Sequence, residues 1–147
     1  MGTSSLKLQQ GNVGLQDFVP APIPPENVLD GEPVARTCNL SQSDDQGLSM
    51  NLWDCTAGRF RWNYYGDELA HILEGEVHVT EETGEVTVLQ AGDTAHFPAG
   101  ARTVWEVPEY VKKLAVHRTP PNLPARVVHK LKTVRARAAL KSAAAAV

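Results

Sequence analysis

Two stretches near the middle of the chain decide the fold: ELAHILEGEVHV at 68–79 and GDTAHFPAG at 92–100. Between them, the runs HVT and EVTVL flank Gly84 and consist largely of β-branched and apolar residues. Such residues favour strands, and a glycine between two strands can take the positive φ that a tight hairpin needs. The Ala-Gly-Asp at 91–93 and the Pro-Ala-Gly at 98–100 are typical of turns. The centre of the chain is therefore predicted to be antiparallel β-structure.

The same reasoning applied outward predicts eight short strands, at 33–40, 47–55, 59–65, 70–80, 84–89, 94–97, 102–107 and 111–117. Eight strands at this spacing are typical of a sandwich or a closed double sheet. Residues 1–32 are rich in turn-forming residues and predict an extended arm with at most a short strand. The tail at 119–147 is basic, and Pro124 favours a helix over about 125–141. We therefore predict one domain at 33–118, an arm before it and a helical tail after it.

Charge is distributed unevenly along the 147 residues. Residues 1–110 hold all 17 acidic residues and five of the 14 basic ones, a net charge of −12, whereas residues 111–147 hold nine basic residues and no acidic one. A helical tail would carry four apolar residues on one face: Val127, Leu131, Val134 and Ala138. We expect this face to dock on the acidic barrel or on a second subunit. The tail lacks aromatic residues for base stacking, so no nucleic-acid partner is predicted.

The remaining composition is that of an ordinary soluble domain. No apolar run approaches the length of about 20 residues that a membrane span needs, and no membrane partner is predicted. The N-terminus lacks the apolar core of a secretory signal. Cys38 and Cys55 have no metal-binding spacing and are interpreted as free thiols, which favours a cytoplasmic location.

The two central stretches resemble the two sequence motifs of the cupins. In the first motif six residues separate a glutamate from a glycine, as in Glu68 to Gly75, and in the second five residues separate a glycine from Pro-x-Gly, as in 92–100. Residues 51–116 further resemble the ureidoglycine aminohydrolase-like cupins, a group that includes the ethanolamine-utilisation cupin. The fold class predicted is all-β: a cupin jelly-roll barrel (double-stranded β-helix) with an N-terminal arm and a short basic C-terminal helix.

Metal-binding cupins use three histidines together with the glutamate of the first motif. Aligned on the two motifs, these histidines fall here on Trp62, Tyr64 and Thr103, and only Glu68 remains. A first-row transition metal needs several imidazole or carboxylate ligands that converge on one point. The usual metal site is therefore predicted to be absent, no cofactor is expected, and dialysed protein should carry no stoichiometric transition metal.

Strand alternation predicts what lies inside the barrel in place of a metal. If Glu68 points inward, the histidines fall on outer faces or beyond the motifs, and all five are interpreted as surface or interface residues: His71, His78, His96, His117 and His129. Two groups share inward faces and form the walls of a candidate cavity: Phe60, Trp62 and Tyr64 on one strand, and Thr103, Trp105 and Val107 on another. Arg59 and Arg61 are expected outside. Of Lys112 and Lys113, one must face inward and is a candidate ligand contact.

Two readings of this interior remain open. In the first, the cavity binds a small polar metabolite, with Glu68 and Tyr64 as candidate catalytic residues and Phe60, Trp62, Thr103 and Trp105 as ligand-binding residues. In the second, the tryptophans fill a packed core, Glu68 is satisfied by Tyr64 or Thr103, and the protein is a non-catalytic binding or assembly module. A metal-dependent aminohydrolase, which the resemblance implies, is disfavoured by the missing ligands.

A homodimer is also predicted. Jelly-roll sheets leave edges and apolar outer faces that pair, and two-fold symmetry is the commonest arrangement of such oligomers. The expected contacts are His71, Ile23 and the arm around Val19.

Overall fold

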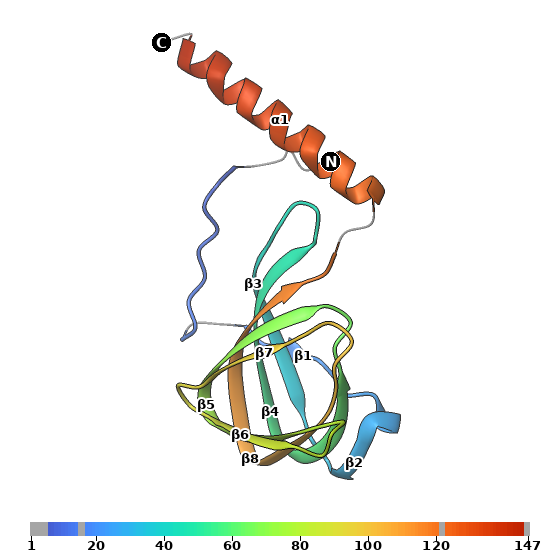
Figure 1. The fold of residues 1–147 in the computed structure, drawn as a ribbon. Helices are drawn as coiled ribbons and strands as arrows, with labels where there is room; N and C mark the ends of the chain where they lie inside the picture. The colour runs from blue at the N-terminus through green and yellow to red at the C-terminus, as the bar shows by residue number, and fades with distance from the viewer. Residues whose placement is uncertain (1–5, 15–16, 121–122, 146–147) are drawn as a thin grey trace.

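The computed structural model describes residues 6–14, 17–120 and 123–145, and it consists of a β-barrel with a helix beyond one end (Figure 1). Its elements in chain order are β1 (Val19–Pro20), the 3₁₀ turn η1 (Pro25–Asn27), β2 (Val28–Gly31), β3 (Ala35–Gln42), β4 (Leu48–Asn63), β5 (Asp67–Glu81), β6 (Val86–Gln90), β7 (Thr94–Phe97), β8 (Arg102–Arg118) and α1 (Leu123–Ala145). All described strand pairs are antiparallel. The predicted all-β jelly-roll barrel is confirmed.

The barrel consists of two facing layers that share three long strands. The strand order is β1-β3-β4-β8-β5-β6, with β2 added to β4 and β7 added to β5. The two halves of β4 pair with different halves of β8: Trp53 lies opposite Lys113, whereas Trp62 lies opposite Thr103. Strand β5 likewise pairs with β7 along its first half and with β6 along its second. The sheet therefore folds over and encloses the core (Figure 1).

Two pairs of predicted strands are single bent strands in the structure. The strands predicted at 47–55 and 59–65 are both part of β4, and those predicted at 102–107 and 111–117 are both part of β8. Between the halves, the register of β4 against β8 shifts at a bulge, but the pairing continues. A bulge bends a strand without ending its ladder. This is why turn-like sequence at these points did not mark a true strand end.

A glycine permits the matching bend in β5. Gly75 has a φ of +76°, and a Cβ at this position would lie 1.9 Å from the carbonyl oxygen of Tyr110 on β8. Only glycine allows so close a backbone approach in this conformation. The register of β5 against β8 shifts on both sides of this point. The bend carries the second half of β5 into the opposite layer.

Much of the predicted N-terminal arm belongs to the barrel. Strand β1 pairs with β3, and β2 pairs with β4, where Val28 lies opposite Phe60. Ile23, between these strands, is buried in the core, so its predicted place in a dimer interface is wrong. The earlier part of the arm stays extended and is held by Gln9, whose side chain exchanges two 2.9 Å hydrogen bonds with the backbone of Gln42.

Large aromatic side chains fill the space between the layers. Phe60 and Trp105 are fully buried, with ring centroids 6.4 Å apart, and Trp53 lies edge-on to both. Burial of one such side chain stabilises the fold by about 1.5–3 kcal/mol relative to leaving it exposed. The middle of the barrel is thus packed rather than hollow.

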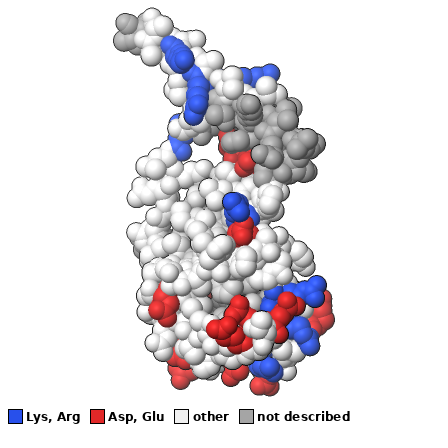
Figure 2. Space-filling model, in the orientation of Figure 1, with Lys and Arg blue, Asp and Glu red and all other residues white. Residues whose placement is uncertain are grey.

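The C-terminal helix stands apart from the barrel. Helix α1 extends further than the predicted 125–141, and its described apolar side chains at Leu131, Val134 and Ala138 are exposed. The expected docking on the chain's own barrel is therefore wrong at these positions; the side chain of Val127 lies outside the described residues. Figure 2 shows basic side chains along the helix and acidic ones gathered at the far end of the barrel. Within the described ranges, no helix is long and apolar enough to span a membrane.

Candidate functional site

A buried ion pair joins two strands inside the barrel. Glu68, near the start of β5, is 3% exposed, and Lys113, on the second half of β8, is 2% exposed. The Nζ of Lys113 donates a hydrogen bond to Oε1 of Glu68. Glu68 points inward with Ala70 and Ile72, as strand alternation predicts. Of the two adjacent lysines, Lys113 is the one that faces inward.

Two indole rings complete the surroundings of this lysine. Its Nζ lies 5.0 Å from the ring centroid of Trp53 and 4.6 Å from that of Trp105. A cation over the face of a tryptophan is attracted by the ring quadrupole, and more strongly where water is excluded. The ammonium group is thus held by one carboxylate and two aromatic faces.

His117 connects the ion pair to the surface. It is an inward position of β8, in step with Val111, Lys113 and Ala115, and its Nε2 lies 3.2 Å from Oε2 of Glu68. Its side chain is 45% exposed, so it reaches solvent as well. Burial lowers the pKa of His117 below its usual value of 6.5; the charge of Glu68 opposes this shift and that of Lys113 reinforces it. His117 is therefore neutral at neutral pH.

Tyr64 lies next to this group with an unsatisfied hydroxyl. Its ring stacks on Phe97 with a centroid distance of 4.5 Å, and its buried oxygen has no hydrogen-bond partner in the described part of the chain. Burial, and then the charge of Glu68, raise the pKa of Tyr64 well above its usual value, while Trp105 and Thr103 oppose part of the rise. Tyr64 therefore keeps its proton and can donate it in a hydrogen bond.

A cavity of about 430 Å³ opens beside this group of residues. Its wall comes from the end of β4, the start of β5, the end of β8 and the turn at η1: Pro24, Asn27, Arg61, Trp62, Asn63, Tyr64, Tyr65, Gly66, Asp67, Glu68, His117 and Thr119. The barrel thus has a pocket at one end, and this pocket reaches one side of the buried ion pair.

Three of the six predicted site residues line this cavity: Trp62, Tyr64 and Glu68. Of the other three, Phe60 and Trp105 lie in the packed core, whereas Thr103 lines two other pockets. Phe60 and Trp105 are fully buried among aromatic rings, and the hydroxyl of Thr103 donates a 2.8 Å hydrogen bond to the carbonyl oxygen of Trp62. The polar partners of Glu68 are Lys113 and His117 rather than Tyr64 or Thr103.

Two residues that line the cavity were not predicted to do so. His117 was assigned to the surface because it follows the second motif; alternation counted on from Lys113 through Ala115 would have placed it inward. Arg61 is exposed, as expected for the outer face, but its guanidinium also donates to the carbonyl oxygen of Glu26 at 3.5 Å and so reaches the cavity rim.

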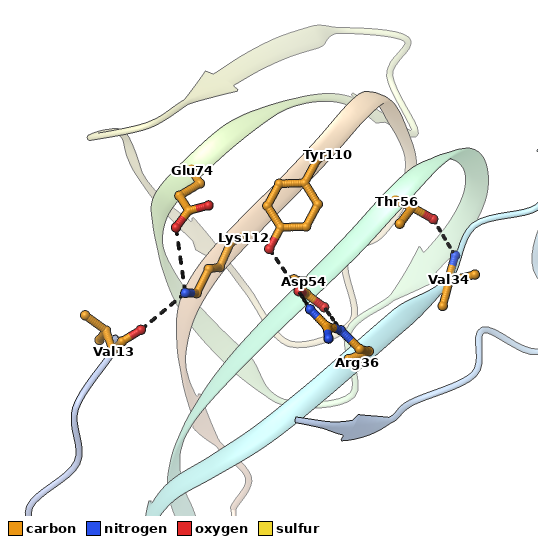
Figure 3. A network of polar contacts seen from close by, with 8 residues as sticks. All are labelled: Val13, Val34, Arg36, Asp54, Thr56, Glu74, Tyr110 and Lys112. Atoms are coloured by element: carbon orange, nitrogen blue, oxygen red, sulfur yellow. Dashed lines mark hydrogen bonds and ion pairs between the residues drawn. The ribbon is translucent and has the colours of Figure 1, made fainter. Parts of the chain in front are cut away.

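A second buried carboxylate lies on the outer face of the same sheet (Figure 3). Asp54 is 2% exposed and accepts hydrogen bonds from Arg36 at 3.1 and 2.5 Å and from the hydroxyl of Tyr110 at 2.9 Å. Burial and Asp54 raise the pKa of Tyr110 to about 12, so its hydroxyl remains a donor. Beside this group, Lys112 donates to the carbonyl oxygen of Val13 at 3.2 Å and ties down the arm.

Comparison with known proteins identifies the family. The model of the EutQ-like cupin domain matches residues 42–115, about half of the chain, and this range includes Glu68, Lys113 and most of the barrel. The chain belongs to the EutQ-like cupin family. The predicted cupin assignment, including its ethanolamine-utilisation branch, is confirmed.

Relatives of this cupin include one curated protein and several solved structures. Acetate kinase EutQ of Salmonella typhimurium is 30% identical over 83 residues, which are 56% of this chain and 36% of that protein, so the chain spans about a third of its length. A protein of unknown function from Pseudomonas syringae pv. tomato is 27% identical with a TM-score of 0.65, over 70% of this chain and 45% of that one. A putative ethanolamine utilization protein Q from Salmonella typhimurium shares the fold at 24% identity and a TM-score of 0.55, over 79% of this chain and all of that one.

The residues of this cupin do not fit the metal centre that many cupins contain. When the chain is aligned on the two cupin motifs, the histidine positions fall on Trp62, Tyr64 and Thr103, and Glu68 is already bound to the ammonium of Lys113. No group of three or more His, Cys, Asp or Glu side chains within the described ranges could hold a metal ion. The positive charge paired with Glu68 comes instead from the chain's own lysine.

Proposed function

We propose that this cupin binds a small polar metabolite in the cavity beside Glu68 and supports metal-independent proton transfer there. The observation that supports the proposal is that the two oxygens of Glu68 contact different partners. One oxygen of Glu68 is held by Lys113, and the other faces the imidazole of His117, which lines the cavity. A volume of about 430 Å³ lies within the range typical of small-molecule sites.

The roles of the two residues follow from their contacts. Because Nε2 of His117 faces a carboxylate oxygen, the hydrogen on Nε2 is favoured, and Nδ1 is left as an acceptor. A neutral imidazole at neutral pH can take a proton from a bound ligand at Nδ1. The imidazolium so formed is stabilised by the charge of Glu68. Tyr64, which also lines the cavity and stays protonated, would donate a hydrogen bond to the bound ligand.

The three tryptophans supply a direct test. Only Trp62 lines the cavity, whereas Trp53 and Trp105 are buried in the core. In an NMR screen of small polar metabolites, a true ligand should shift the Trp62 indole signal first. We expect Glu68→Gln and His117→Asn to weaken such binding by about tenfold or more, by loss of contacts to a charged group.

A matched pair on the surface provides the control. His78 and Glu76 also lie in contact, at 2.5 Å, but outside the cavity. His78→Asn and Glu76→Gln should leave binding unchanged. The proposal fails if no compound shifts Trp62, or if the cavity and surface variants behave alike. The alternative of a non-catalytic binding module, which the packed core favours, would show binding without any proton exchange or turnover.

We further propose that the protein forms a homodimer through the outer face of β4, β8 and β5. Leu69 on β5 is 54% exposed and lies beside Val116 on β8, and Leu48 at the start of β4 is also exposed. Sedimentation should give twice the 16.0 kDa chain mass, and Leu69→Glu should shift the equilibrium toward monomer. The matched control is Val86→Glu, an equally exposed valine on β6. A cytoplasmic location also remains a proposal, consistent with two unpaired thiols.

A further inference from the structure

We infer that the ligand of this cavity is a small organic acid whose carboxylate binds Arg61 while its other end reaches Glu68 and His117. The inference rests on the proposed binding site and adds the chemical class of its ligand. The charged side chains around the cavity determine which ligand charge it can accept.

The two carboxylates in the cavity wall are already neutralised. Glu68 is paired with Lys113. Asp67 accepts hydrogen bonds from Arg118 at 3.2 and 2.5 Å and from the backbone of Ala99 at 3.2 Å. The hydrogen bond from Arg118, followed by that from Ala99, lowers the pKa of Asp67, which therefore stays ionised. These pairs add no net charge to the cavity.

Arg61 is different. Within residues 6–14, 17–120 and 123–145, no carboxylate forms an ion pair with its guanidinium, which donates a long hydrogen bond of 3.5 Å to the carbonyl oxygen of Glu26. Glu26 lies in η1, and its neighbour Asn27 lines the same cavity. The contact therefore places the guanidinium at the rim, between β4 and η1.

With His117 neutral and both carboxylates paired, the side chains that line this cavity have a net charge of about +1, which comes from Arg61; the same side chain also lines a neighbouring pocket with Glu81, Glu82 and Arg102. This charge matches a monoanion. A guanidinium presents two parallel N–H donors that fit the two oxygens of a carboxylate, and such charge-assisted pairs are among the stronger hydrogen bonds. A phosphate dianion would call for a second cation. Asn27, Asn63 and Thr119 provide neutral polar groups for hydroxyl or carbonyl substituents on the acid.

The acidic body of the protein does not prevent this binding. Residues 1–110 carry a net charge of −12, but charges farther away than about 8 Å are largely screened at physiological salt. Arg61 would lie within direct contact of the bound carboxylate, where the local attraction outweighs the screened field. The general field would nevertheless repel polyanions, which is consistent with a ligand of single charge.

The test compares acids with their uncharged amides at constant ionic strength. Glycolate, L-lactate and propionate are titrated against glycolamide, lactamide and propionamide, with the Trp62 indole signal as the readout. We expect the acids to bind about tenfold or more tightly than the amides, because a charged hydrogen-bonding partner is lost in the amide. Arg61→Gln should remove this preference.

Arg59 is the matched control. It lies two residues earlier on the same strand and is exposed, but it sits outside this cavity and 4.0 Å from Glu106. Arg59→Gln should leave the preference for acids in place. Equal binding of acids and amides, or an acid preference that survives Arg61→Gln, would overturn the inference. So would a failure of all three acids to bind, or tighter Arg61-dependent binding of inorganic phosphate.

These outcomes separate the inference from the proposed function. If amides bind as well as acids and Glu68→Gln still abolishes binding, the cavity is a ligand site but not an acid site. If neither Glu68→Gln nor His117→Asn changes the binding of any compound, the proposed function itself fails.

Discussion

Two buried carboxylates, Glu68 inside the barrel and Asp54 on its outer face, are satisfied in different ways. Both oxygens of Asp54 accept hydrogen bonds, from Arg36 and Tyr110, and Asp54 lines none of the described cavities. Glu68 has one oxygen held by Lys113, while the other faces a titratable histidine beside a cavity. A saturated carboxylate can only stabilise the fold, whereas the second arrangement can also take part in binding.

The two cations differ as well. The side chain of Arg36 is half exposed and stacks on Phe18 at 4.7 Å, so water remains available if its partner is lost. Lys113 is enclosed by indole rings and has no such alternative. Breaking the inner pair should therefore cost more than breaking the outer one.

The largest effect is expected for Lys113→Met. Removing one partner of a buried ion pair leaves an uncompensated charge and typically costs about 3–5 kcal/mol. Denaturant unfolding measures the loss. In the double variant Lys113→Met/Glu68→Met no charge is left buried, and most of the lost stability should return.

The neighbouring lysine provides the control. Lys112→Met removes a hydrogen bond to the arm and a 3.7 Å contact with Glu74 at the surface, and should cost less than about 1 kcal/mol. If the two lysine variants are equally stable, the buried Lys113–Glu68 pair contributes no more to the free energy of unfolding than the surface contacts of Lys112.

For the outer pair, Asp54→Asn should cost about 1–3 kcal/mol, since charge-assisted hydrogen bonds are lost but Arg36 can be hydrated. Ligand affinity at the cavity should not change, because Asp54 lies on the other face of the sheet. If Asp54→Asn destabilised the protein more than Lys113→Met, or if it altered ligand binding at Trp62, the proposed difference between the outer and inner carboxylates would be wrong.

The fold of this chain could be predicted from its sequence, but the contacts of Glu68 could not. The fold could be predicted because the spacing of Glu68, Gly75 and the turn at 98–100 reports local strand and turn geometry. The partner of Glu68 could not, because Lys113 is 45 residues away and meets it only through the register of β5 against β8. The division of the interior into a packed middle and a cavity at one end could not be predicted for a related reason: Trp53 and Lys113, which lie opposite each other on β4 and β8, meet Trp105 only in the folded barrel.

A smaller effect is expected for the pH dependence of stability. The pKa of His117 is lowered in the folded protein, so below its usual value of about 6.5 the unfolded chain binds more protons than the folded one. The stabilising contribution is therefore present above pH 6.5 and is lost as the pH falls through the folded-state pKa. His117→Asn should flatten this part of the stability profile. A His117 imidazole signal that titrates above 6.5 by NMR would contradict the account.

The smallest effect concerns the thiol next to Asp54 and involves reactivity rather than stability. Burial and the charge of Asp54 raise the pKa of Cys55 to about 12, and a thiol that stays protonated is a poor nucleophile. Cys38 is only partly buried and serves as the internal reference. With iodoacetamide at pH 8, mass spectrometry should find Cys38 alkylated and Cys55 untouched in the folded protein, and both alkylated in denaturant. Asp54→Asn removes one cause of the shift but leaves the burial, so Cys55 should stay protected in that variant. Rapid alkylation of Cys55 in folded Asp54→Asn would mean that the outer carboxylate, with its bound Arg36 and Tyr110, keeps this part of the sheet closed.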